Sequence, residues 1–137
     1  MEPFSIATAA AGLAKLCYSL VQELKETIEI MKSRRQALVD LLYAIERFRL
    51  LLEQVQALSQ QARDPSSKKY EQAFDKQDTV RILEEMRAVI QQVNAPGKPE
   101  IIKDVAWRLQ NPAVKSLYER LEKRETQIQT LLLLICT

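Results

Sequence analysis

The chain contains no histidine, and this absence removes most catalytic chemistry from consideration. Ser-His and Cys-His nucleophile pairs, the HExxH metal motif and most zinc ligand sets all require histidine. A di-iron helical bundle requires Glu-x-x-His motifs, which a chain without histidine cannot contain. With only two glycines, the chain also has no glycine-rich loop that could hold a phosphate. We therefore expect a protein that is not an enzyme and has no catalytic residue, cofactor or metal.

Cysteine and excess charge are also scarce. Cys17 and Cys136 are the two cysteines, and they lie 119 positions apart, which is not the spacing of a metal-binding pair. We interpret both as small buried apolar residues of a reduced, intracellular protein, with a bridge between them left open. The net charge is +2, from 20 basic and 18 acidic residues. Such near balance argues against a dedicated nucleic-acid-binding protein.

The residues that are abundant favour helix. Ala, Leu, Glu, Lys, Gln and Arg dominate the 137 residues, and the scarcity of glycine leaves little material for the turns of a sheet. We predict one all-α domain, an up-down bundle of four main helices with one or two short extra helices. The main helices are expected from about residue 5 to 31, 34 to 62, 79 to 94 and 112 to 136. Short helical pieces are expected near residues 70–74 and over 100–109, with Asn111 capping the last helix before Pro112.

Apolar residues three or four positions apart predict the buried face of each helix. Glu46 and Arg49 are three apart on the second helix and are expected to pair. Trp107 is predicted to be a core anchor. The predicted core positions are Ile6, Ala10, Leu13, Cys17, Leu20, Leu24, Ile28 and Met31; Leu38, Leu41, Leu42, Ile45, Phe48, Leu52, Val55 and Leu58; Val80, Leu83, Met86, Val89, Ile90 and Val93; and Val114, Leu117, Tyr118, Leu121, Ile128, Leu131, Leu132 and Ile135.

The first helix is unusually poor in charge. Lys15 is the single charged residue between Glu2 and Glu23. Two interpretations compete for residues 3–22: a core helix wrapped by its neighbours, or a helix stored in the bundle and released to a membrane or to partner copies. Gly12 within it suggests either close helix packing or a hinge. The N-terminus has no basic region of a secretory signal, and no uncharged apolar run is long enough for a conventional transmembrane helix.

Two segments resemble a known group of fungal proteins. The opening Met1 to Ala7, followed by Ala9 to Leu13, resembles the start of N-terminal domains of fungal STAND, or NLR-like, receptors, including the HeLo-like type. Asp104 to Trp107 and Lys115 to Glu122 resemble the Trp-containing segment and the charged closing helix of that family. The stretch from Arg108 to Pro112 departs from the pattern because many relatives are more basic there.

The resemblance implies a helical bundle at the N-terminus of a receptor, followed along the chain by a nucleotide-binding module and repeats. We accordingly expect residues 1–137 to be the N-terminal part of a longer protein. In HeLo-like relatives the domain executes cell death, in innate immunity and heterokaryon incompatibility, and its first helix is thought to target membranes, as in the mixed-lineage kinase-like pseudokinase. The implied protein is cytoplasmic and moves to the plasma membrane when it self-associates.

The leading hypothesis is therefore a membrane-targeting, cell-death-inducing effector domain. Its partners would be further copies of the chain, downstream receptor domains and anionic membrane lipids. The alternative is a non-lytic interaction or oligomerisation module with an exposed apolar patch around Leu131 to Ile135. The residues assigned to the membrane are Phe4, Ile6, Leu13, Leu16, Leu20, Lys32, Arg34 and Arg35.

Overall fold

The computed structural model describes residues 6–30, 35–61, 76–93 and 99–136. These residues form four helices, α1 (Ile6–Ile30), α2 (Arg35–Gln61), α4 (Lys76–Val93) and α5 (Glu100–Cys136), and they contain no strand. The all-α prediction is confirmed, and the ends of α1, α2 and α4 agree with the expected ones to within a few residues. For helix positions 6, 30, 35, 59–61, 93, 100–111, 135 and 136 only the backbone is described. The short helical piece expected near residues 70–74 lies outside the described residues.

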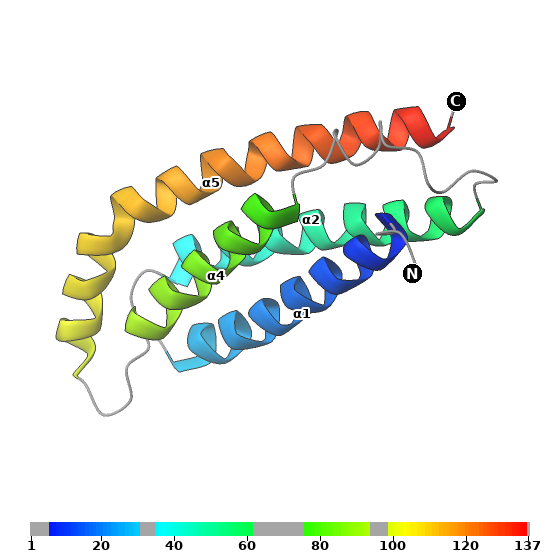
Figure 1. The fold of residues 1–137 in the computed structure, drawn as a ribbon. Helices are drawn as coiled ribbons and strands as arrows, with labels where there is room; N and C mark the ends of the chain where they lie inside the picture. The colour runs from blue at the N-terminus through cyan, green and yellow to red at the C-terminus, as the bar shows by residue number, and fades with distance from the viewer. Residues whose placement is uncertain (1–5, 31–34, 62–75, 94–98, 137) are drawn as a thin grey trace.

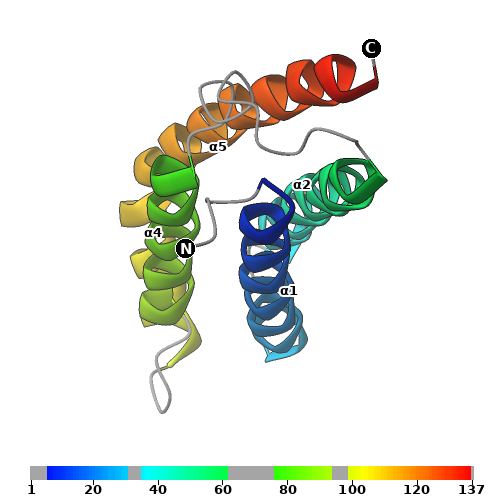
Figure 2. The same cartoon turned by 45° about the vertical axis from the view of Figure 1, so that its right-hand side comes forward.

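The four helices pack in a ring. The closely packed pairs are α1 with α2, α2 with α5, α5 with α4 and α4 with α1. Figures 1 and 2 show α1 and α4 running toward one end of the molecule, and α2 and the C-terminal part of α5 running toward the other. The helices α2 and α4 follow one another among the described helices, but they are not one of the close pairs. Short connections alone would have made these two helices neighbours.

The last two predicted helices form one continuous helix in the structure. We expected a short helix over 100–109 and a new start at Asn111–Pro112, but α5 continues from Glu100 to Cys136 with Pro112 inside it. A proline in a helix removes one backbone hydrogen bond and crowds the preceding turn, which bends the helix without always ending it. Figure 1 shows α5 bending between its yellow and orange parts, on either side of this position.

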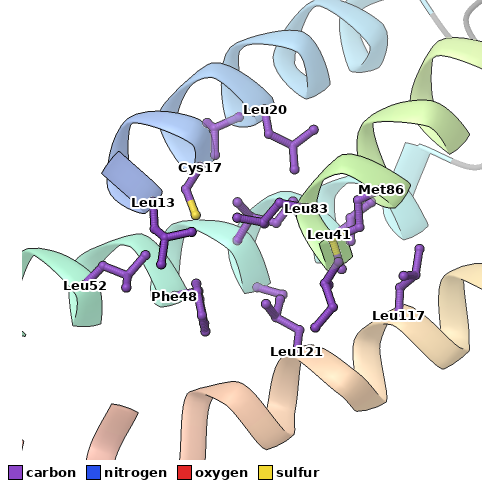
Figure 3. Close-up of a cluster of buried hydrophobic side chains, with 14 of the residues drawn as sticks. Leu13, Cys17, Leu20, Leu41, Phe48, Leu52, Leu83, Met86, Leu117 and Leu121 are labelled. Atoms are coloured by element: carbon purple, nitrogen blue, oxygen red, sulfur yellow. The ribbon is translucent and has the colours of Figure 1, made fainter. Parts of the chain in front are cut away.

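The core lies at the centre of the ring and takes apolar side chains from every helix. Figure 3 shows Leu13, Cys17 and Leu20 of α1 facing Phe48 and Leu52 of α2, with α4 and α5 closing the other side. Full burial of a Leu, Ile or Phe side chain stabilises a fold by about 1.5–3 kcal/mol. Among the described side chains, most predicted core positions are buried, and the half-buried exceptions are Leu42, Leu58, Val80, Tyr118 and Leu132. The side chains of Ile6, Met31, Val93 and Ile135 lie outside the described residues.

Candidate functional site

The first helix divides into two unlike faces. Its apolar residues gather on the face that packs against α2 and α4, and the outer face carries exposed residues such as Thr8, Gly12, Lys15 and Tyr18. The low charge of α1 therefore comes from uncharged residues on the outer face. The buried face consists of Ala9, Ala10, Leu13, Ala14, Cys17, Leu20, Val21, Leu24, Thr27 and Ile28.

The three described side chains assigned to membrane contact lie against the core of the bundle. Leu13 and Leu20 are buried in the core, and Leu16 is half-buried against it. The side chains of Ile6 and Arg35 are outside the described residues, as are Phe4, Lys32 and Arg34 altogether. In this arrangement the described members of the set stabilise the bundle, and any contact with lipid would require α1 to move.

Gly12 is exposed on the outer face of α1. A Cβ built on it meets no atom of the described residues within 4 Å. Close packing of another described helix on Gly12, one of the two expected roles, is therefore not found. The backbone is helical here, and a hinge is the role that stays a prediction.

Cys17 lies at the centre of the buried face and its thiol is free. Burial raises the pKa of this thiol from its usual 9.0 to about 12, although the positive charge of Arg49 opposes the change. The thiol is thus protonated and unreactive while α1 stays in place. The prediction of a small buried apolar residue is confirmed for Cys17, and the side chain of Cys136 is outside the described residues.

One arginine of α4 holds two side chains of α1. The Arg87 Nε donates to Glu23 Oε2 at 3.0 Å, and its Nη2 donates to Ser19 Oγ at 2.9 Å. Ser19 and Glu23 are four positions apart, so they lie on the same side of α1. We call this the Arg87 clasp, and it joins α1 to α4 at the C-terminal end of the charge-poor stretch.

Further arginines join the other helices. Arg47 on α2 bonds Glu125 on α5 at 2.7 Å. Arg120 on α5 reaches Glu85 and Asp78 on α4, at 2.7 and 3.2 Å. Arg124 lies 3.1 Å from the same Asp78. Sequence reasoning missed all of these pairs because their members are far apart along the chain, and only the packing order of the helices brings them together.

The expected pair within α2 is confirmed. Arg49 donates from Nε and Nη2 to the two carboxylate oxygens of Glu46, at 2.9 and 3.0 Å, and from Nη1 to Glu53 at 2.7 Å. These hydrogen bonds to Arg49 lower the pKa of Glu46 below its usual value of 4.5. The network stiffens the outer side of α2, next to α1.

A groove of about 800 Å³ runs between α2 and α5. Ala37, Ala44 and Val114 give it an apolar floor, and Tyr118 forms part of its wall. The Tyr118 hydroxyl is buried and has no hydrogen-bond partner among the described residues. Burial, with a smaller effect of Asp40, raises the pKa of this phenol to about 12, so it stays protonated.

The apolar patch expected around Leu131 to Ile135 is present in part. Leu131 is buried and Leu132 half-buried, whereas Leu133 and Leu134 have exposed fractions of 69% and 36%. Only the backbone of Ile135 is described. The exposed part of this patch on α5 is therefore small, and it lies near the C-terminal end of the helix.

The described helices contain neither a metal-binding cluster nor a membrane-spanning segment. Within the residues that the structure describes, no group of three or more Cys, Asp or Glu side chains could hold a metal ion. None of the described helices combines the length and the hydropathy that crossing a bilayer demands. The side chain of Trp107, predicted as a core anchor, is outside the described residues. No protein-family model, curated protein or solved structure matches this chain.

Proposed function

We propose that this chain is the N-terminal effector domain of a fungal immune-type receptor of the STAND or NLR-like class, with a HeLo-like role in programmed cell death. The resemblance of Met1 to Leu13 and of Lys115 to Glu122 supports the family assignment. In this proposal the four helices form an up-down bundle in the cytoplasm. Oligomerisation of receptors releases α1 to the plasma membrane, and membrane damage follows.

The observation that carries the proposal is the division of α1 into two faces. Its buried aliphatic side chains lie on one face, and Lys15 lies with the exposed Tyr18 outside that face. A released α1 would be an amphipathic helix whose charge stays in water while its apolar face enters the interface. Such a helix would lie in the plane of the membrane, which agrees with the absence of a described helix able to span it.

Release of α1 would move its apolar face from the core of the bundle into lipid. Leaving the bundle exposes side chains such as Leu13, Leu20 and Leu24, each contributing about 1.5–3 kcal/mol when buried. Lipid can replace much of this burial, so α1 has two states of comparable free energy only when a membrane is present. Lys32, Arg34 and Arg35 follow α1 in sequence, and each basic residue near an anionic surface adds about 1 kcal/mol of attraction.

Removing residues 1–20 would not test this proposal, because the deletion removes core residues and unfolds the bundle. A charge reversal on the outer face avoids this problem. Lys15→Glu should lower leakage of dye from anionic vesicles by about fivefold, since Lys15 is exposed and a released α1 places it at the lipid surface. Lys123→Glu, an equal charge change on an exposed position of α5, should leave leakage unchanged. Equal effects of the two variants would contradict a special role for α1.

The second candidate is a non-lytic interaction or oligomerisation module of such a receptor. The exposure of Leu133 at the end of α5 favours it, because an exposed leucine beside Leu134 suits a contact with a second copy. Light scattering of the chain with and without lipid separates the candidates. A lipid-independent dimer that Leu133→Glu abolishes, and that the neighbouring Gln129→Glu leaves intact, would favour the module.

A further inference from the structure

We propose that the groove between α2 and α5 binds an amphipathic helix of a partner protein that carries Lys or Arg beside its apolar residues. This inference goes beyond the proposed function, since it concerns partner recruitment on a face that α1 does not form. It holds whether or not α1 leaves the bundle. Two properties of the groove support it: its shape and its charge.

The shape suits a helix of about three turns. The groove runs along α2 from Ala37 to Arg47, a length of about 15 Å at the helical rise of 1.5 Å per residue. Its floor is low because Ala37 and Ala44 have the smallest apolar side chains and Val114 is the facing residue on α5. Tyr43 stands at the edge of the groove with an exposed fraction of 64%. Aliphatic residues of a docked helix would fill this floor, as in other helix-in-groove complexes.

The charge of the groove specifies a basic partner. Asp40 on α2 and Glu119 and Glu122 on α5 line it and are exposed. Among the described residues, the cations of the groove are Lys115 and Arg47, and Arg47 is already paired with Glu125 outside the groove. Carboxylates are thus in excess on a chain whose net charge is +2. Complementary charge steers a partner and fixes its register on such a surface.

Tyr118 and Asp40 belong to the wall of the groove. The Tyr118 side chain is half-buried, and its hydroxyl is buried and out of reach of a ligand in the groove. The carboxylate of Asp40, which accepts from Gln36 Nε2 at 2.9 Å, is the acidic group of α2 among the described residues of this groove.

The test uses the whole chain and a fluorescein-labelled 14-residue peptide of Leu and Lys with Leu at helical spacing. Binding is followed by fluorescence anisotropy without lipid. Combined Asp40→Asn, Glu119→Gln and Glu122→Gln should weaken binding by about fivefold or more, as expected for the loss of three exposed charge pairs. The matched control, Glu26→Gln with Glu29→Gln and Glu84→Gln, removes three exposed carboxylates elsewhere and should change Kd by less than about twofold.

A further comparison keeps the result specific. A peptide with the same composition in a scrambled, non-amphipathic order should bind more weakly than the patterned peptide. Equal weakening in the groove and control variants, or equal binding of the scrambled peptide, would overturn the proposal. A dimer of the chain alone that the groove variant dissociates would also overturn it, since the occupant would then be a second copy.

Discussion

The Arg87 guanidinium on α4 lies 3.0 Å from the Glu23 carboxylate on α1, measured from Nε to Oε2. This pair connects the helix that we propose to be released with a helix that we expect to stay. It lies at the end of the charge-poor stretch of α1, where the apolar face meets the first acidic residue after Glu2. Breaking it should loosen α1 while leaving the apolar core unchanged.

A double-mutant cycle with Arg87→Ala and Glu23→Ala measures this connection. The two side chains keep exposed fractions of 27% and 34%, so the coupling in the free energy of unfolding should be about 0.2–1 kcal/mol. Urea unfolding supplies the four values of the cycle. The exchanged pair, Arg87→Glu with Glu23→Arg, should recover part of the loss. A coupling of zero, with no recovery, would show that the clasp does not hold α1.

Gly12→Ala should stabilise the chain. The position is inside a helix, and an added methyl group enters open space among the described residues. Alanine is favoured over glycine in a helix by about 1 kcal/mol, so the free energy of unfolding should rise by about 0.5–1 kcal/mol. Thermal and urea unfolding check this value. A loss of stability would instead reveal a close neighbour of Gly12.

Leu13 and Leu133 should respond very differently to truncation. Leu13→Ala removes a fully buried side chain and should lower the free energy of unfolding by about 2–5 kcal/mol. Leu133→Ala changes an exposed position and should alter it by less than about 0.5 kcal/mol. Equal losses would mean that the end of α5 is covered, for instance by a second copy, and the concentration dependence of unfolding would then identify a dimer.

The Glu46–Arg49 pair predicts a dependence of stability on pH. Because the folded chain holds the pKa of Glu46 below its usual value of 4.5, the ionised carboxylate stabilises the folded state. This contribution is fully present above pH 4.5 and is lost as the pH falls through the lower pKa of the folded chain. Glu46→Gln should therefore be destabilising at pH 7, and the difference from the unsubstituted chain should shrink at pH 3. A difference that grows at pH 3 would contradict this assignment.

Local patterns predicted the helices and their buried faces well. Leu13, Phe48, Met86 and Leu121 were identified from spacing alone, because a helix that covers a core repeats its apolar residues every three or four positions. The Glu46–Arg49 pair was predictable for the same reason, since spacing on one helix decides which side chains can meet.

The helix start that was predicted wrongly and the ion pairs that were missed have physical explanations. Asn111–Pro112 is a strong start signal, yet α5 continues through it with a bend, because a proline removes one backbone hydrogen bond and can kink a helix without ending it. The pairs Arg87–Glu23 and Arg120–Asp78 depend on which helices are neighbours, and no local pattern encodes this order. The groove between α2 and α5 follows from the same order, with small side chains at Ala37 and Ala44.

The distance between α1 and α4 in the presence of lipid tests the central claim most directly. Spin labels are placed at Tyr18→Cys on α1 and Arg81→Cys on α4, which are both exposed, with Cys136→Ser as background. Cys17 should stay unlabelled because burial raises its pKa to about 12. Arg81→Cys with Lys123→Cys, on α4 and α5, is the control pair.

Pulsed electron spin resonance then gives the distance distribution with and without anionic vesicles. The proposed release of α1 predicts that the Tyr18–Arg81 distribution lengthens and broadens when anionic vesicles are added, while the Arg81–Lys123 distribution does not change. An unchanged Tyr18–Arg81 distance in samples that make the vesicles leak would contradict the release of α1.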